Sequence, residues 1–335
     1  MKIVLSGSPP RVGVWAGGHI IDANLAVQQL LLDKRGSRDA GDQAGALAPP
    51  ELNAFIAGGE RTLDTTREAV DYVAAAEPAA GGQPISRRVE EVALLAPWVR
   101  GNRIACAGAN YALHVAGIEA AREGSALDVA EVQRRSRESG PWGFWKVPDV
   151  VKGPEDEVAY PSRATLLDYE GEAAVIIGKP ARDVSEAEAR SCFWGVTLLN
   201  DWSIRNDMGQ GRPMSFNLPK NFDGSTSMGP CILVGEFDPQ NIAVVTKVNG
   251  QVRQDYNTDQ MTWGFAEYLQ FLARDFTFQP GDVLSGGTGA GTAMDSSRRG
   301  AGGKASTELF LKPGDVVEVS SPSIGMLRNR IVSKN

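Results

Sequence analysis

The sequence predicts an α+β fold that is predominantly β, rather than a doubly wound parallel sheet. Two Pro-Gly-Asp-Val turns, at Pro280–Val283 and Pro313–Val316, each lead into an apolar strand, and Asn249-Gly250 between β-forming residues is typical of a hairpin. The predicted strands outnumber the helices and do not alternate with them as βαβ units. A mixed, largely antiparallel architecture follows, and at 335 residues two domains are expected.

Residues 1–92 are expected to form a small α/β module at the N-terminus. The segments Arg11–Trp15 and His19–Asp22 have the composition of two short strands around a glycine turn. Helices are expected near Ala26–Asp33 and Leu63–Ala76, and the Gly-, Ala- and Pro-rich segment between them is interpreted as a loop.

Residues 93–335 are expected to form the larger domain, in which three segments indicate helices. Ser185–Glu188 has the pattern of a capping box and should begin a short helix. Phe265–Arg274 carries apolar residues at helical spacing, which indicates a helix packed on the core. The polar segment 118–140 is interpreted as one or two exposed helices; a mobile lid over a site is the alternative to a solvated face.

Composition and charge narrow the class of protein. Hydrophobic residues make up 42% and charged residues 22%, as in ordinary globular proteins. The net charge of −7 and the lack of a long basic tract argue against nucleic acid as a partner. No apolar run is long enough to span a membrane and no signal-peptide core is present, so no membrane partner and a cytoplasmic location are expected. Three widely spaced cysteines without a CxxC pattern indicate buried thiols in a reducing compartment.

The stretch Asp168–Glu172 carries three acidic residues at alternate positions, followed by an apolar run. Alternate side chains of a strand share one face, so Asp168, Glu170 and Glu172 would project together. Burying such a row without a counter-charge costs several kcal/mol, and a hard divalent cation such as Mg²⁺ or Ca²⁺ is the simplest compensation. Because Asp201 ends another apolar run, the two glutamates and Asp201 form a candidate metal-binding triad.

Several segments, in their order along the chain, resemble the motifs of the fumarylacetoacetate hydrolase superfamily. The matching segments are Gly108–His114 (G-x-N-Y-x-x-H), Phe144–Pro148 (F-x-K-x-P), Asp168–Glu172 (D-Y-E-x-E), Asn200–Arg205 (N-D-x-S-x-R), Lys220–Asp223 with Gly229-Pro230, Val248–Gln254 with Thr258 and Met261, and Gly314-Asp315 with Ile324–Asn329. Each motif is weak alone, but their common order is specific. The resemblance covers roughly residues 93–335 in detail and the N-terminal module only loosely.

The resemblance implies a mixed β-roll domain of the kind found at the C-terminus of that superfamily, usually in a homodimer. It places a site for Mg²⁺ or Mn²⁺ on Glu170, Glu172 and Asp201, in agreement with the charge argument. Asp168 matches the motif but is not usually a direct ligand.

The resemblance also implies catalytic roles for Lys220 and His114. Lys220 matches a lysine near the substrate and would share the charge of an enolate. His114 would act as the base that deprotonates water, since histidine suits this role near neutral pH. Members that are hydrolases commonly carry H-x-x-E, and this chain has Gly117 in place of that glutamate. Glu119 or Glu123 is a candidate substitute; the alternatives are that His114 acts alone or that hydrolysis does not occur.

Four further residues in the matching segments are candidates for binding the substrate. Thr288 lies in a glycine cluster that is expected to turn tightly near a ligand. Arg205 could bind a substrate carboxylate or form a structural ion pair. Tyr111 and Gln254 complete the set.

The expected function is that of a metal-dependent hydrolase which cleaves a C–C bond in a 1,3-diketone or an acylpyruvate-type 2-oxo acid, as in aromatic catabolism. Such a substrate can chelate the cation through two oxygens, and the cation stabilises the enolate. Decarboxylation, isomerisation, or hydratase or lyase chemistry of a 2-oxo diacid through the same enolate is the alternative. A non-catalytic ligand-binding protein is a third hypothesis.

Overall fold

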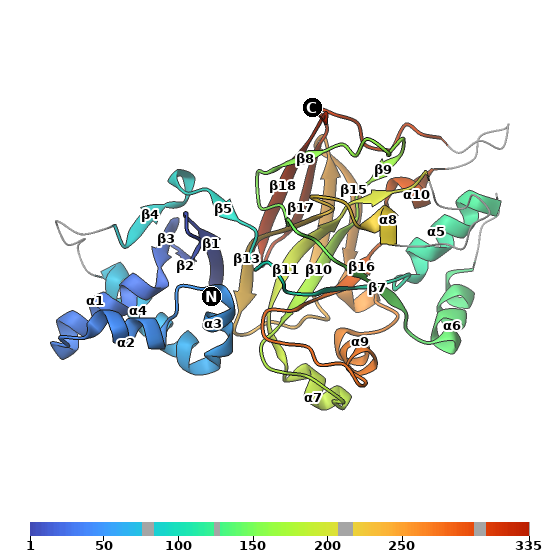
Figure 1. Cartoon of the computed structure of the whole chain (residues 1–335). Coiled ribbons are helices and arrows are strands. Elements are labelled where there is room, and N and C mark those ends of the chain that lie inside the picture. The colour runs from blue at the N-terminus through green and yellow to red at the C-terminus, as the bar shows by residue number, and fades with distance from the viewer. Residues whose placement is uncertain (76–83, 124–127, 207–216, 298–305, 335) are drawn as a thin grey trace.

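The computed structural model describes residues 1–75, 84–123, 128–206, 217–297 and 306–334 (Figure 1). An eleven-stranded sheet runs through the molecule, and its neighbouring strands are antiparallel except for β16 and β6. The strands follow the order β4 (Ser86–Arg88), β3 (His19–Asp22), β2 (Arg11–Ala16), β1 (Lys2–Ser6), β13 (Thr226–Val234), β11 (Phe193–Asp201), β10 (Gly171–Ile177), β16 (Val283–Thr288), β6 (Ile104–Ala107) and β7 (Gly143–Lys146), with β5 (Leu94–Leu95) paired to β1.

A five-stranded sheet packs against the centre of the large one (Figure 1). It contains β15 (Gln251–Asn257), β14 (Ala243–Val248), β17 (Val316–Ser321), β18 (Gly325–Val332) and β8 (Glu157–Ala159), in that order. Val319 and Leu327 of this sheet lie in one buried cluster with Val196 and Leu198 of β11. This cluster therefore fills the space between the two sheets, and the predicted predominantly β, mixed α+β fold is confirmed.

Two short strands and several helices complete the larger part of the chain. The two-stranded pair is β9 (Leu167–Asp168) with β12 (Ser203–Ile204). The helices are α5 (Ala112–Glu123), α6 (Val129–Ser139), α7 (Glu186–Arg190), α8 (Asn217–Lys220), α9 (Phe265–Leu272) and α10 (Ala293–Ser296), with 3₁₀ turns at η1 (Val89–Glu91) and η2 (Thr258–Gln260). The capping box of α7, the core-packed α9 and the Asn-Gly hairpin between β14 and β15 confirm local predictions.

The polar segment forms α5 and α6, which lie beyond β7 at one end of the large sheet (Figure 1). α5 begins at Ala112, before the polar segment, and so carries His114 in its first turn. The role of these helices as a lid stays a prediction.

The N-terminal strands are hydrogen-bonded to the rest of the sheet, because β1 pairs with β13. α1 (Ala23–Arg35) and α4 (Gly59–Ala75) confirm the two expected helices. The boundary at residue 92 stays a prediction.

The loop expected between α1 and α4 is wrong, because the segment folds as α2 (Ala40–Leu47) and α3 (Leu52–Ala57). In α2, buried alanines recur four residues apart, and in α3 Leu52, Phe55 and Ile56 form one buried face. The Glu51 carboxylate accepts from the N–H groups of Asn53 and Ala54 and so caps α3. Burial of small and apolar side chains thus outweighs the breaking tendency of the glycines in this segment.

The three cysteines are free and buried, as expected. Of the helices in the described ranges, none combines the length and the apolar composition of a bilayer-spanning segment.

Candidate metal centre and catalytic site

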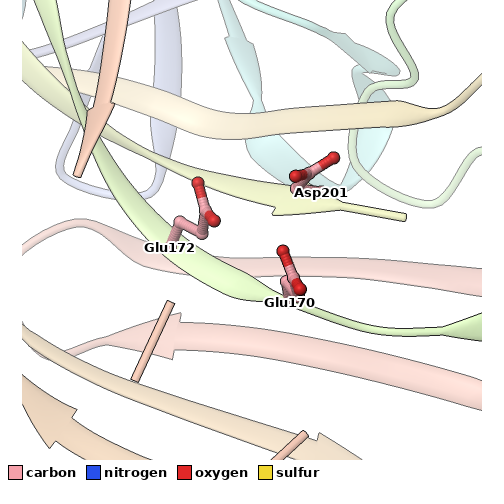
Figure 2. Close-up of side chains that lie close together, drawn as sticks. All are labelled: Glu170, Glu172 and Asp201. Carbon is pink, nitrogen blue, oxygen red and sulfur yellow. The ribbon is translucent and has the colours of Figure 1, made fainter. Parts of the chain in front are cut away.

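The pairing of β10 with β11 brings three acidic side chains together. Gly171 lies opposite Asn200, and the Asp201 N–H donates to the Glu170 carbonyl at 2.9 Å. Glu172 lies two residues further along β10, on the same side as Glu170. Figure 2 shows the three side chains converging from the two strands, and one ligand oxygen of each lies within 4.8 Å of the others. All three are buried, with exposures of 5%, 2% and 0% for Glu170, Glu172 and Asp201.

Buried cations neutralise two of these carboxylates. The Lys220 Nζ donates to Glu170 Oε2 at 2.5 Å, to Asp201 Oδ2 at 2.7 Å and to the Ser203 hydroxyl at 2.6 Å. The Lys146 Nζ donates to the other oxygen of Asp201 and to the Lys220 carbonyl. The Arg205 guanidinium donates to the other oxygen of Glu170. Each oxygen of Glu170 and Asp201 therefore accepts from a cation.

Glu172 differs from its neighbours, since within the described residues it forms no ion pair and accepts only from the Ser285 hydroxyl. Burial raises the pKa of Glu172 well above its usual value, and repulsion from Asp201 and Glu170 raises it further. For Glu170, burial acts in the same direction, but Lys220 and Arg205 lower the pKa overall. Glu172 is thus the carboxylate that lacks a cation.

The donor set fits a hard divalent cation. Within the described residues, four buried carboxylates, those of the triad and of Asp168, lie around three buried cations, Lys146, Lys220 and Arg205. The deficit of positive charge falls on Glu172, at the point where the three ligand oxygens of the triad converge. Carboxylate oxygens are the ligands that Mg²⁺ and Mn²⁺ prefer. Glu170, Glu172 and Asp201 are therefore suited to hold such an ion.

The raised pKa of Glu172 predicts how pH alters the effect of Mg²⁺ on stability. Without metal, the folded state keeps a proton that the unfolded chain releases above about pH 4.5, so Glu172 destabilises the fold as pH rises. Mg²⁺ binds the ionised carboxylate and competes with that proton. We therefore expect the Tm increase caused by saturating Mg²⁺ to grow between about pH 5 and about pH 8.

This prediction is checked by thermal unfolding at both pH values, with and without Mg²⁺. The matched control is Glu172→Gln, which cannot titrate at this position and should show no Tm increase with Mg²⁺ at either pH. An equal Mg²⁺ effect on the wild-type Tm at both pH values would contradict the prediction.

His114 is the next candidate, and its partner is an acid that the sequence did not indicate. The His114 Nδ1 lies 2.6 Å from Asp295 Oδ2, with side-chain exposures of 8% and 3%. Asp295 belongs to α10, 181 positions further along the chain. No local pattern marks it, because the contact depends on the packing of α10 against α5.

The acids proposed as substitutes for the glutamate missing at Gly117 do not take this place. Glu119 pairs instead with Arg135 at 2.8 Å and lines a cavity of about 220 Å³ beside Trp142. The side chain of Glu123 lies outside the described set. Among the described residues, Asp295 is the carboxylate bonded to His114.

Two of the substrate-binding candidates support the segment that carries the two glutamates of the triad. The Gln254 amide nitrogen donates to the Thr288 hydroxyl at 2.7 Å and to the Gly289 carbonyl at 2.9 Å, and its oxygen accepts from the Gly171 N–H at 3.0 Å. The Thr288 hydroxyl donates to the Gly171 carbonyl at 2.9 Å. These contacts hold Gly171, which separates the two glutamates.

The other two substrate-binding candidates, Arg205 and Tyr111, differ from this pair in their surroundings. The Arg205 guanidinium pairs with Asp168 at 2.9 Å and with Glu170, as in the structural ion pair considered from sequence. Tyr111 is buried, and by distance and angle its hydroxyl has no hydrogen-bond partner in the described residues. Its ring packs edge-on against that of Tyr256, with 4.9 Å between the ring centroids, and a role of Tyr111 in binding the substrate stays a prediction.

Two packed sheets that bury a carboxylate triad able to hold a divalent cation define the class, a predominantly β enzyme fold with a candidate metal centre. Residues 103–332 match the family model described as fumarylacetoacetate (FAA) hydrolase C-terminal. The chain belongs to this family, which confirms the resemblance stated from the motifs.

Known proteins resemble this chain over most of its length. A mitochondrial oxaloacetate tautomerase of Homo sapiens is 29% identical over 286 residues, covering 85% of this chain and 80% of that protein. One of Bos taurus is 30% identical over 287 residues, with the same coverage. The solved structure of fumarylacetoacetate hydrolase from Exiguobacterium antarcticum is 26% identical, covers all of both chains and superimposes with a TM-score of 0.71.

Proposed function

We propose that this protein is a metal-dependent enzyme that enolises a 2-oxo acid, and that its reaction is keto–enol tautomerisation of a 2-oxo dicarboxylic acid. The observation that carries the proposal is Glu172, a buried carboxylate without a cation at the point where three ligand oxygens converge. The names of the human and bovine relatives support the reaction class.

Glu170, Glu172 and Asp201 would hold the Mg²⁺ or Mn²⁺ ion. Such an ion polarises a chelated 2-oxo group and stabilises the negative charge of its enolate. Lys220 keeps Glu170 and Asp201 in place and adds positive charge beside them.

His114 is the group proposed to move the proton. Its Nδ1 faces Asp295, which leaves Nε2 to exchange a proton with the substrate. In the tautomerisation Nε2 takes a proton from the carbon next to the carbonyl and returns one to the enolate oxygen, so the enol forms without net loss of atoms. Tyr111, which is buried beside Tyr256, is a further candidate for contact with a substrate carboxylate.

Hydrolytic C–C cleavage is the second candidate and uses the same enolate. Here His114 would deprotonate water, which attacks the distal carbonyl; the C–C bond breaks to give one acid and the enolate, and the proton on His114 returns to the enolate carbon to give the second acid. The name of the Exiguobacterium antarcticum enzyme and the presence of an acid beside His114 support this reaction.

The proposal is tested on purified protein with a panel of 2-oxo acids, with Mg²⁺, with Mn²⁺ and with a chelator. Metal-dependent acceleration of keto–enol exchange without cleavage is the expected result. Release of two acids from an acylpyruvate establishes the hydrolase instead, and release of carbon dioxide establishes a decarboxylase. Metal binding without turnover on the whole panel would overturn the proposal in favour of a silent ligand-binding protein.

His114→Gln is expected to lower kcat by about 10²–10⁴-fold, because a positioned acid–base group contributes that much, while Mg²⁺ binding persists. Steady-state kinetics and calorimetric Mg²⁺ titration measure the two effects. The chain offers a matched control in His19, its other histidine, which is exposed; His19→Gln should retain full turnover. Unchanged turnover in His114→Gln would remove this residue from the mechanism.

The homodimer, the cytoplasmic location and the role in aromatic catabolism stay predictions. The names of the human and bovine relatives place those proteins in mitochondria. Sedimentation of the purified chain tests the dimer.

A further inference from the structure

We infer that Asp295 is the positioning residue for His114, and that Gly117 is the residue that makes room for it. The inference rests on the proposed role of His114 as the proton-transfer group. Its starting point is the 2.6 Å contact between His114 Nδ1 and Asp295 Oδ2, with both side chains buried. A carboxylate oxygen accepts this hydrogen bond, so in the neutral imidazole Nδ1 carries the hydrogen and Nε2 has the free lone pair.

Asp295 is itself held rigidly, as a positioning residue must be. Both of its oxygens lie 3.0 Å from the Gly291 N–H, and its own N–H donates to the Thr292 hydroxyl. A carboxylate with these restraints offers His114 one fixed acceptor rather than a range of rotamers.

The segment that carries Asp295 is also tied to the strand that leads into the metal-binding triad. Asp168 accepts from the N–H groups of Ala293 at 2.8 Å and Met294 at 3.1 Å. The Tyr169 hydroxyl donates to the Gly291 carbonyl at 2.9 Å. Asp168 and Tyr169 directly precede Glu170, so the position of the histidine is coupled to that of the metal ligands through short, buried contacts.

Asp295 fills the space that a side chain at position 117 would need. A Cβ atom placed on Gly117 would lie 2.9 Å from the Asp295 Cβ and 3.3 Å from its carbonyl oxygen. The first distance is too short for two carbon atoms, so a side chain at position 117 and the observed position of Asp295 exclude each other. Position 117 is also three residues after His114 on the same helix face, from which a longer acid could reach the imidazole. The carboxylate that bonds to His114 can therefore come from α5 or from α10, but not from both.

The first experiment compares the holoenzyme with Asp295→Ala, Asp295→Asn and a control, Asp71→Ala, in which an exposed aspartate of α4 is removed. We expect both Asp295 variants to lose about 100-fold in kcat with little change in KM, and Asp71→Ala to match the wild type. Asparagine keeps the shape of the side chain, so it separates loss of the acid from loss of packing.

The histidine tautomer is a second readout that needs no turnover. The chain has only two histidines, so ¹⁵N spectra of the imidazoles are simple to assign, and His19 is an internal reference. The wild type should show the Nδ1–H tautomer for His114, and Asp295→Asn should shift it to Nε2–H. If the wild type turns over but both variants keep its kcat, or if the His114 tautomer is unchanged, the inference is overturned. If the wild type has no turnover, the proposed function fails, and the tautomer alone decides the role of Asp295.

The second experiment exchanges the two positions. Gly117→Glu alone should unfold at a lower temperature than the wild type, because the new side chain meets Asp295. The double variant Gly117→Glu/Asp295→Gly removes that clash, and we expect it to be about 10-fold more active than Asp295→Gly and to recover the Nδ1–H tautomer. A double variant no better than Asp295→Gly in both readouts would show that the positions are not exchangeable and would overturn the proposed relation.

Discussion

Glu172→Gln is expected to abolish Mg²⁺ binding at millimolar concentrations and to lower kcat by about 10³-fold, since several kcal/mol of charge stabilisation in the transition state would be lost. Glutamine has nearly the same shape and can still bond to the Ser285 hydroxyl, so the fold should persist. The metal-free variant should even be more stable than the wild type at neutral pH, because the substitution removes a buried carboxylate that has no cation.

Calorimetric titration with Mg²⁺, thermal unfolding and steady-state kinetics measure these effects. Glu236→Gln is the matched control, because Glu236 is exposed and lies away from the triad in the sequence. Wild-type Mg²⁺ affinity in Glu172→Gln would remove this glutamate from the ligand set, and with it the main support for the metal centre.

Lys220→Met is expected to destabilise the metal-free protein by about 3–5 kcal/mol, because it leaves two buried carboxylates without their shared cation. Burial acts to lower the pKa of Lys220, but Asp201 and Glu170 raise it overall, so the amine stays charged in the wild type. A divalent cation can replace part of the lost positive charge. Mg²⁺ should therefore stabilise Lys220→Met more than it stabilises the wild type.

Urea unfolding with and without Mg²⁺ measures both parts of this prediction. Lys312→Met, at an exposed position, serves as the control and should stay within about 0.5 kcal/mol of the wild type. If Lys220→Met lowers the free energy of unfolding by no more than Lys312→Met does, the buried ion pairs do not contribute to folding as the geometry indicates.

Local features of the fold could be predicted because short-range chemistry decides them. The Asn249-Gly250 hairpin and the Ser185 capping box each depend on a few neighbouring residues, and both are present. α2 was missed because its two glycines favour a loop, and α3 because it is only six residues long and follows Pro49-Pro50. What decides between these states is the burial of residues such as Ala44 and Phe55 against other elements.

The residues of the candidate site also fall into two groups, those that could be predicted from the sequence and those that could not. The spacing of Glu170 and Glu172 follows from strand alternation, and the motif resemblance added Asp201 and Lys220. Asp295 could not be found, because no spacing links it to a histidine 181 positions away. The charge role of Lys146 was also missed, although its motif was identified.

By itself, the sequence determined the family, the predominantly β fold and the acidic residues suited to a divalent cation, because these depend on motif order, two-residue alternation and side-chain chemistry. Only the tertiary structure decided which charges meet. It left Glu172 without a cation, placed three cations around its neighbours and put the carboxylate of α10 beside His114 in the space that Gly117 leaves open. Electrostatic energy and steric exclusion depend on distances in space, and these are set by strand register and helix packing rather than by separation along the chain.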